Sequence, residues 1–527
     1  MTSTLWAGGI LVANRGEIAI RIMRAAAALG IRTVAVYTPD DADSLHVRRA
    51  DDAHELPGTY LGGTQVLAVA RATGVAAVHP GYGFLSENAA FARQCADAGI
   101  TFVGPPPDLL ELFGHKGRAR ELAGQLAVPV LPGTDGPTSV ERAVAFAREH
   151  GSVLLKALAG GGGHGMRVVT DPAGVTEAYQ RCRSEARRAF GNGDLYVEAL
   201  LPAARHIEVQ VVGDGATVQH LWERDCGIQR HQQKLIEVAP CPTLDPALRD
   251  QLIAAALRMA AHVNYASLGT FEFLLSGNDF WFIEANPRLQ VEHTVTEEIT
   301  GIDLVGTQLR LAAGASIADV GLSTPPTPTR FAVQARVNLE TLRADGSVRP
   351  QAGTLRSFTP PSGPGVRVDT YGYTGYATSV RYDSLLAKVI TTGPDFPAAA
   401  ALAATALGEF DVTGVATNIP QLQRILRHQD FRPGHWTTTF VADHLAELVS
   451  DETTRPQDST AVPAPVQGIV MDVAVAQGDH VPAGGRLVVL EAMKMEHVVR
   501  AEHGGVVLAV AVGKGDQVAE DDPLVFL

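Results

Sequence analysis

A tandem repeat near the end of the printed sequence limits what this part of the chain can fold into. The segments Gly468–Leu490 and Gly505–Leu527 are each 23 residues long and match at eleven positions when aligned without a gap. Each copy has short apolar runs broken by a Gly-Asp pair, which predicts short β-strands joined by tight turns. We therefore expect two four-stranded units that form a small, all-β flattened barrel. The fourteen residues between the copies would form a hairpin, with Lys494 near its tip.

The residues around Lys494 are unusual for a turn. Lysine on an exposed hairpin is common, but here it is flanked by Met493 and Met495, whereas turns normally carry polar residues. The string Ala492–Met495 (AMKM) resembles the attachment motif of the biotin carboxyl carrier family. In the related lipoyl domains the lysine usually lies between Asp and Ala. The resemblance implies that a biotin protein ligase attaches biotin covalently to Lys494.

Composition narrows the classes of function for the whole chain. A length of 527 residues suffices for about three to four domains, and a net charge of −14 argues against nucleic-acid and anionic-membrane partners. The four cysteines are not closely spaced, so we expect neither a zinc ribbon nor a disulfide framework. Because we find no signal peptide and no bilayer-spanning apolar run, we expect a cytoplasmic protein.

The N-terminal part alternates predicted strands with predicted helices. The expected strands are Gly8–Asn14, Thr33–Tyr37, Val75–Val78 and Thr101–Val103, and the expected helices are Glu17–Leu29 and Asn88–Ala98. Such alternation predicts a parallel, doubly wound α/β domain. The segment His79–Asn88, which contains Tyr82 and Gly83, follows a strand. Ligands bind at such positions in these folds.

A glycine run marks a candidate nucleotide-binding lid. Residues 160–163 are four consecutive glycines, and Lys156 lies at the end of the predicted strand Val153–Lys156 that precedes them. Unobstructed backbone N–H groups in such a loop can close over phosphates, although the spacing is not that of a P-loop. A flexible linker is the alternative for a glycine run alone. The lysine before the run favours the lid.

The segment Gly269–Thr296 predicts a metal site. Two strands, Thr270–Leu275 and Phe280–Asn286, flank a hairpin turn, and folding about that turn places Glu272 opposite Glu284. Like charges opposite each other are unfavourable, so the pair needs a cation or raised pKa values. Asn286 lies on the same side of its strand as Glu284. Two carboxylates and an amide oxygen suit Mg²⁺, whereas solvated surface glutamates would be the simpler alternative.

Several of these motifs together resemble biotin carboxylase of the ATP-grasp fold. The string Glu284–His293 (EANPRLQVEH) carries most of the resemblance, supported by Asn14–Glu17 and His79–Asn88. The resemblance implies an α/β multidomain chain similar to the α subunit of acyl-CoA carboxylases. Its expected parts are an N-terminal domain at 1–115, an ATP-grasp domain at 116–325 with a lid at about 132–203, a C-terminal domain at 326–446, a linker at 447–461 and a carrier domain at 462–527. In the C-terminal domain we expect a strand at Phe331–Asn338 and helices at Asn418–Leu426 and Thr439–Leu448.

The resemblance also implies roles for individual residues. Mg²⁺ or Mn²⁺ would be held by Glu272, Glu284 and Asn286. ATP would contact Lys116, Lys156, Gly162, Gly163, Glu198, Leu201, His206 and Glu272. Bicarbonate and biotin would contact Lys234, Arg288, Gln290, Val291, Arg336, Tyr82 and Gly83. Glu292 would deprotonate bicarbonate, with Arg288, Arg336 and Lys234 as the other catalytic residues.

Three positions depart from the family pattern. Ala199 replaces a lysine after the hinge glutamate, His164 replaces an arginine in the glycine loop, and Gln232 replaces a nucleotide-contacting histidine. These departures concern ATP affinity, while the metal, base and bicarbonate positions are intact. Two other classes of function remain as alternatives: an ATP-grasp enzyme that ligates an unrelated carboxylate and amine, and a non-enzymatic carrier that binds ATP without turnover.

The acceptor of the carboxyl group is the least determined part of the function. Because the repeat runs to the last residue, we expect a separate carboxyltransferase (β) subunit, and we expect the carboxylase to be a homo-oligomer. The predicted acceptor is an acyl-CoA of the acetyl or propionyl type. The alternative is pyruvate or another 2-oxo acid.

Overall fold

The computed structural model describes residues 6–134, 136–158, 165–449, 461–492, 495–518 and 522–527. The chain divides into two compact units, Met1–Val449 and Ser450–Leu527. Within the described residues, no helix is long and apolar enough to cross a membrane. The four cysteines are buried and unbridged.

The N-terminal domain has the predicted parallel sheet. Five strands pair in the order β3-β2-β1-β4-β5, all in parallel. Its elements are β1 (Ile10–Val12), α1 (Gly16–Ala28), β2 (Thr33–Tyr37), η1 (Pro39–Asp41), α2 (Leu45–Arg49), β3 (Asp52–Glu55), α3 (Gly63–Thr73), β4 (Ala77–His79), α4 (Ala89–Asp97), β5 (Thr101–Phe102) and α5 (Pro107–Gly114). Strand β3, which carries mostly polar residues, was not predicted.

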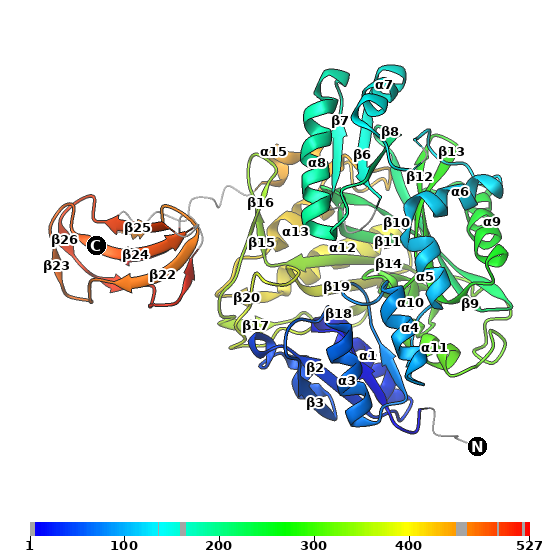
Figure 1. The fold of residues 1–527 in the computed structure, drawn as a ribbon, viewed down its shortest axis with the longest axis horizontal. Helices are drawn as coiled ribbons and strands as arrows, with labels where there is room; N and C mark the ends of the chain where they lie inside the picture. The colour runs from blue at the N-terminus through cyan, green and yellow to red at the C-terminus, as the bar shows by residue number, and fades with distance from the viewer. Residues whose placement is uncertain (1–5, 135, 159–164, 450–460, 493–494, 519–521) are drawn as a thin grey trace. The chain divides into compact units, whose positions relative to one another are not determined.

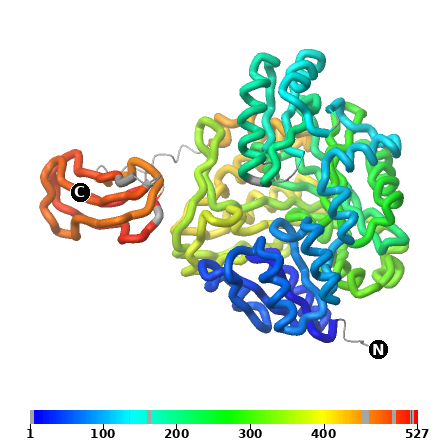
Figure 2. The backbone as a smooth tube through the Cα atoms, in the orientation of Figure 1, coloured from blue at the N-terminus to red at the C-terminus, as the bar shows by residue number. Residues whose placement is uncertain are grey.

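A smaller lobe follows this domain in the sequence and precedes the strands of the central sheet. Its three antiparallel strands pair in the order β7-β6-β8, and helices α7 and α8 lie against them (Figure 1). The elements are α6 (Lys116–Gln125), which precedes the lobe, α7 (Val140–His150), β6 (Val153–Ala157), β7 (Met166–Val169), η2 (Pro172–Gly174), α8 (Val175–Phe190) and β8 (Leu195–Ala199). Figure 2 shows that the chain leaves the body of the unit to form this lobe and then returns.

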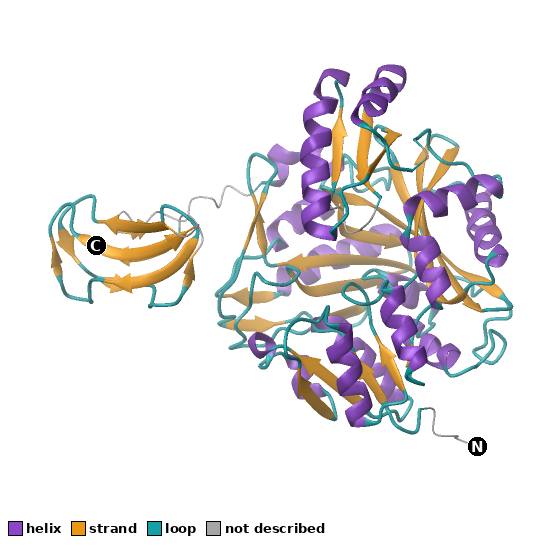
Figure 3. Cartoon of the chain, viewed as in Figure 1, coloured by secondary structure: helices purple, strands orange, loops and turns teal. Residues whose placement is uncertain are grey.

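An eight-stranded sheet forms the centre of the first unit (Figure 3). Its order is β13-β12-β9-β10-β11-β14-β19-β18, with antiparallel neighbours throughout. The strands are β9 (Arg205–Asp214), β10 (Val218–Arg230), β11 (Gln233–Ala239), β12 (Ala266–Ser276), β13 (Asp279–Asn286), β14 (Phe331–Asn338), β18 (Val366–Thr370) and β19 (Leu385–Gly393). The accompanying helices are α9 (Pro246–His262), α10 (His293–Thr300) and α11 (Leu304–Ala312).

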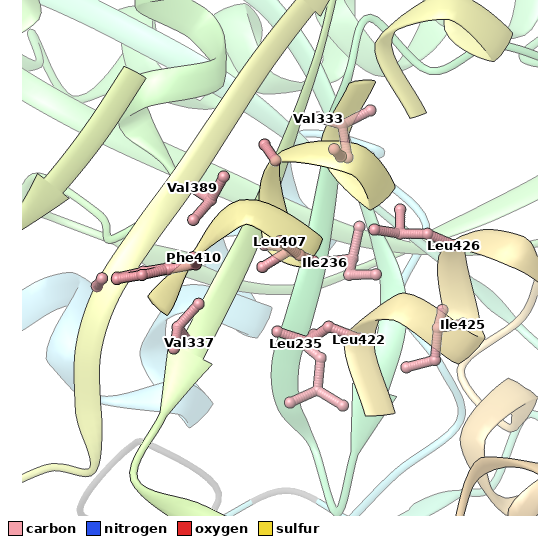
Figure 4. Packing of buried hydrophobic residues seen from close by; sticks show 14 of the residues in the cluster. Leu235, Ile236, Val333, Val337, Val389, Leu407, Phe410, Leu422, Ile425 and Leu426 are labelled. Atoms are coloured by element: carbon pink, nitrogen blue, oxygen red, sulfur yellow. The ribbon is translucent and has the colours of Figure 1, made fainter. Parts of the chain in front are cut away.

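Alternation along the strands separates the core from the site. In β12, Phe271 and Phe273 point into a core shared with α9, whereas Thr270 and Glu272 occupy the other face. In β14, Val333 and Val337 pack against helices α12 (Phe396–Glu409) and α13 (Ile419–Arg427). Figure 4 shows this packing, with Leu407 of α12 and Leu422 of α13 facing the sheet.

The C-terminal domain is completed by short elements. These are β15 (Glu340–Leu342), β16 (Val348–Pro350), β17 (Ser357–Thr359), β20 (Asp411–Thr413), α14 (Phe440–Asp443) and α15 (Leu445–Leu448). The segment Thr439–Leu448, which was predicted to be helical, is present as the two short helices α14 and α15. They are separated at His444, whose φ of −109° and ψ of 17° depart from helical values.

The second unit has the predicted pseudosymmetry. The strand sets β25-β24-β22 and β21-β29-β27 are related by the repeat. Its strands are β21 (Ala461–Pro463), β22 (Gly468–Val473), β23 (His480–Val481), β24 (Arg486–Ala492), β25 (Met495–Arg500), β26 (Gly505–Val506), β27 (Ala509–Val510), β28 (Gln517–Val518) and β29 (Pro523–Phe526). Each repeated half also includes one strand, β21 in the first half and β25 in the second, that precedes the 23-residue copy in the sequence instead of lying within it. The pair Ala492–Met495 closes the predicted hairpin, whose Lys494 lies outside the described residues.

The core under β12 offers a test of stability. Phe271 is fully buried, so we expect Phe271→Ala to lower the free energy of unfolding by about 3–5 kcal/mol. Leu61→Ala, at a side chain that is 62% exposed, should change it by less than about 0.5 kcal/mol. Urea unfolding followed by tryptophan fluorescence isolates the first unit, because all four tryptophans lie in it. Equal midpoints for the two variants would contradict this packing.

Candidate active site

Four charged residues form a continuous row across the central sheet. Strand register places Glu284 of β13 opposite Glu272 of β12, Glu272 opposite Glu208 of β9, and Glu208 opposite Arg224 of β10. The predicted pairing of Glu272 with Glu284 is therefore present. Three adjacent carboxylates repel one another, so the row requires cations close by.

Lys234, from β11, supplies the central cation. Its Nζ lies 2.6 Å from Glu208, 3.0 Å from Glu272 and 2.6 Å from Glu292, which precedes α10. Burial lowers the pKa of Lys234, but these three carboxylates outweigh burial and hold it well above 10.5. Burial likewise raises the pKa of Glu292, yet Lys234, Arg336 and Arg224 hold it below 4.5. Both groups are therefore charged at neutral pH.

Arg224 braces the row from its other end. The side chain is fully buried and pairs with Glu208. It also donates hydrogen bonds to Gln210, Thr270, Gln290 and Thr296. Neither Arg224 nor Glu208 was predicted as a site residue. A signal that could have found Glu208 is the alternation of polar and apolar residues in β9, where His206, Glu208 and Gln210 share one face.

The predicted metal ligands gather where β12 and β13 meet. Asn286 donates to Glu272 at 2.9 Å, and Lys116 at the start of α6 donates to Glu284 at 2.5 Å. Lys116 and Lys234 thus neutralise the two carboxylates. The donor set fits a hard divalent cation once the Asn286 amide turns to present its oxygen, because Mg²⁺ and Mn²⁺ prefer carboxylate and carbonyl oxygens.

The predicted nucleotide-binding residues lie on both sides of this junction. Lys156 of β6 pairs with Glu198 of β8, which Arg120 also contacts at 3.3 Å. His206 Nε2 lies 2.9 Å from Glu272, and Gln229 contacts its Nδ1 at 2.5 Å. Leu201 and Ala199 follow Glu198, and both are half-buried. The predicted lid residues Gly162 and Gly163, together with His164, lie outside the described residues.

The turn that carries Gln232 has a strained backbone. Arg230 pairs with Gln233, which leaves His231 and Gln232 as a two-residue hairpin turn with φ values of 45° and 64°. Such turns normally carry glycine or asparagine. The turn lines a cavity of about 470 Å³ together with residues of β7 and α8. Gln232 therefore faces the small lobe, although its effect on ATP affinity stays a prediction.

The residues predicted for bicarbonate adjoin the base. Arg288 donates to Glu87 at 2.5 Å and to Asn286 at 3.1 Å, and Gln290 donates to Glu272 at 2.9 Å. Val291 is half-buried and directly precedes Glu292. The loop from 288 to 292 thus contacts both the row and the predicted metal ligands.

The residues predicted for biotin lie on the other side of Glu292. Arg336 of β14 contacts Glu292 at 3.0 Å and Glu237 at 2.5 Å. Tyr82, in the loop after β4, donates its hydroxyl hydrogen to Glu17. Gly83 lies beside it with a φ of 66°. Glu237 and Glu17 were not predicted as site residues, and both are buried.

Comparison with known families accounts for most of the chain. Four family profiles match in succession: "Biotin carboxylase, N-terminal domain" at 7–110, "Carbamoyl-phosphate synthase L chain, ATP binding domain" at 115–320, "Biotin carboxylase C-terminal domain" at 334–443 and "Biotin-requiring enzyme" at 459–527. A crystal structure of the biotin carboxylase domain of Hydrogenobacter thermophilus 2-oxoglutarate carboxylase has 40% sequence identity and a TM-score of 0.80, and the match covers 84% of this chain and 98% of that one.

The chain belongs to the biotin carboxylase family. This biotin carboxylase is joined to a biotinyl domain, so the predicted family and fold class are confirmed, and its domains are those of an ATP-dependent biotin carboxylase ligase. Its ATP-binding and biotin-requiring domains support the predicted ATP and biotin cofactors.

Longer relatives contain further sequence. Pyruvate carboxylase of Bacillus subtilis is 46% identical over 454 residues, covering 83% of this biotin carboxylase and 39% of the relative. A single-chain, multi-domain long-chain acyl-CoA carboxylase has 46% identity and a TM-score of 0.75, and the match covers 98% of this chain and 50% of that one. The chain therefore spans about two fifths of the length of the pyruvate carboxylases it matches.

The lowered pKa of Glu292 predicts a pH dependence. Because its folded-state pKa is below 4.5, the unfolded chain binds a proton first as the pH falls. The stability that Glu292 contributes is therefore present above about pH 4.5 and is lost below it. We expect the wild-type protein to lose more thermal stability between about pH 6 and pH 4 than Glu292→Gln does. Parallel curves for the two proteins, measured by circular dichroism, would contradict an ionised Glu292.

Proposed function

We propose that this chain carboxylates biotin on Lys494, using ATP and bicarbonate. The observation that carries the proposal is the ionised Glu292, held between Lys234 and Arg336 beside the carboxylate row. In the overall reaction, ATP, bicarbonate and biotin give ADP, phosphate and carboxybiotin. Three cationic side chains near Glu292 are available to bind an anion: Lys234, Arg288 and Arg336.

Glu292 is proposed to remove the proton from bicarbonate. A carboxylate with two cations against it is a weak base, because those cations stabilise its ionised form. Binding of bicarbonate draws Lys234 toward the new anion. Loss of the contact with Lys234 raises the proton affinity of Glu292 when a base is needed. The deprotonated bicarbonate then attacks the γ-phosphorus of ATP to give carboxyphosphate and ADP.

The remaining site residues bind and orient the nucleotide. Lys116 and Lys156 are proposed to contact phosphates from separate elements, while Glu272, Glu284 and Asn286 hold Mg²⁺ or Mn²⁺. When bound, the divalent cation neutralises charge on the transferring phosphoryl group. The H. thermophilus domain was crystallised with MgADP and bicarbonate, which supports both ligands here.

Biotin is proposed to bind between Tyr82 and Arg336. Carboxyphosphate releases CO₂ and phosphate, and the phosphate takes the N1 proton of biotin. Negative charge then develops on the ureido oxygen of biotin, and the deprotonated N1 attacks CO₂ to give carboxybiotin. Arg336 stabilises that charge, because its guanidinium is permanently cationic and lies beside the predicted biotin contact Tyr82.

The proposed final acceptor is pyruvate or another 2-oxo acid, reached through a carboxyltransferase. The curated relatives that support it are named pyruvate carboxylase, so the acyl-CoA acceptor predicted from the sequence becomes the second candidate. An acyl-CoA acceptor is retained as the second candidate because the single-chain acyl-CoA carboxylase matches nearly all of this chain. A separate carboxyltransferase subunit, the homo-oligomer and the biotin protein ligase stay predictions.

Glu292 provides the direct test of the reaction. We expect Glu292→Gln to reduce bicarbonate-dependent ATP turnover by about 10²–10⁴-fold, because the variant loses the base but keeps a similar shape. Release of ADP is the measurement, with free biotin present. Glu447→Gln, at an exposed glutamate of α15, is the control and should retain activity. Full turnover by Glu292→Gln would refute the assigned base.

The acceptor can be tested through the carrier. Avidin capture from the native cell should retain the wild-type chain and lose Lys494→Arg, because only the former carries biotin. The captured material, given ATP and labelled bicarbonate, should transfer label to pyruvate or another 2-oxo acid. Transfer to an acyl-CoA instead would establish the second candidate. Retention of Lys494→Arg on avidin would refute Lys494 as the attachment residue.

A further inference from the structure

Lys388 is a fully buried cation that the proposed mechanism does not use. It lies on β19, where the register places it opposite Arg336 of β14 and opposite Asp369 of β18. Two cations in cross-strand positions repel each other unless each has its own counter-charge. Arg336 has Glu237 and Glu292, whereas Lys388 has Glu17 at 2.9 Å and Asp369 at 4.0 Å. Lys388 therefore belongs to the same charged face as the site.

The ammonium of Lys388 also fixes the loop that precedes α10. It donates a hydrogen bond of 3.1 Å to the carbonyl oxygen of Val291. The neighbouring carbonyls are held locally: Gln290 accepts from His293, and Glu292 accepts from Val295 at 3.2 Å. The Val291 carbonyl is thus held from a strand nearly a hundred residues away. Its peptide bond continues directly into Glu292.

The ammonium of Lys388 is also linked, through Glu17, to Tyr82, which is proposed to bind biotin. Oε1 of Glu17, in the first turn of α1, contacts both Lys388 and the hydroxyl group of Tyr82. Asn14 fixes the Tyr82 loop as well, donating to the carbonyl oxygens of Pro80 and Tyr82 at 2.7 Å. A single cation therefore links the loop that carries the base to the tyrosine on the other side of the site.

We propose that Lys388 is a positioning residue that sets the Val291–Glu292 peptide for bicarbonate and, through Glu17, the Tyr82 hydroxyl for biotin. This inference rests on the proposed function and deepens it. A buried ion pair alone would need only Glu17 or Asp369 as partner. The additional bond to a carbonyl in the base loop is what gives Lys388 a role in substrate geometry.

Two variants separate the contact of Lys388 with Val291 from its contact with Glu17. Glu17→Gln keeps the bond from Lys388 to Val291 but removes the carboxylate that faces Tyr82. Lys388→Met combined with Glu17→Gln removes both charges together, so that neither partner is left as an uncompensated buried charge. The control is Arg249→Met with Glu223→Gln, which removes an ion pair of 2.9 Å between helix α9 and the buried Glu223 of strand β10, away from the loop.

The measurements are the KM values for bicarbonate, free biotin and ATP in the full chain. We expect Glu17→Gln to raise only the KM for biotin, and the Lys388/Glu17 double variant to raise the KM for bicarbonate about tenfold as well. Loss of one charge-assisted hydrogen bond corresponds to a change of this size. The KM for ATP should stay within about twofold in both variants, since neither contact reaches the nucleotide residues. The control should change none of the three constants.

Other outcomes would overturn the positioning role. An unchanged bicarbonate KM in the double variant would refute it, as would equal rises in the KM for ATP and bicarbonate. If the double variant does not fold, an unchanged biotin KM in Glu17→Gln refutes the link to Tyr82. Bicarbonate-dependent ATP turnover by the wild-type protein is measured in parallel. Its presence distinguishes these results from a failure of the proposed function. The ¹³C NMR line broadening of labelled bicarbonate is compared between the wild type and the double variant without ATP. This comparison tests the contact of Lys388 with Val291 independently of turnover.

Discussion

The contact of Lys234 with three carboxylates is the interaction on which the rest of the site depends. Glu208 and Glu272 lie side by side by strand register, and Glu292 approaches them from the loop before α10. Without a cation among them, the three groups would repel one another or take up protons. Lys234 lies among the three carboxylates and Arg224 pairs with Glu208 at the end of the row, and the pKa values of Glu272 and Glu292 are lowered, so these two carboxylates stay ionised. The local geometry of β9 to β12 is therefore tied to one ammonium group.

The sheet separates this charge from the hydrophobic core. Apolar and polar residues alternate in β12, so that Phe271 and Phe273 pack into the core while Glu272 lies on the other face of the sheet. The same division holds in β14, where Val333 and Val337 face α12 and α13 and Arg336 faces the site. Dense packing under the strands holds their backbones in register. That register then fixes the spacing of the charged groups.

The sequence predicted the local parts of this arrangement better than the distant ones. Strand β14, the β12–β13 hairpin and the pairing of Glu272 with Glu284 were anticipated, because turn residues and alternation lie close together in the chain. Glu208, Arg224 and Glu237 were missed as site residues. They reach the site only through β9, β10 and β11, whose neighbours come from distant segments. No short-range pattern encodes such pairing, so it became visible only in the folded chain.

Charge balance in the row also constrains how ligands bind together. Lys116 and Lys234 neutralise the same carboxylates that are proposed to hold a divalent cation. An arriving cation must therefore release these lysines, which then need anions of their own. Phosphate groups and bicarbonate are such anions. Metal and anionic substrates consequently raise each other's affinity by equal factors, as thermodynamic reciprocity requires. The row of glutamates would thus couple the binding of the metal to the binding of the anionic substrates.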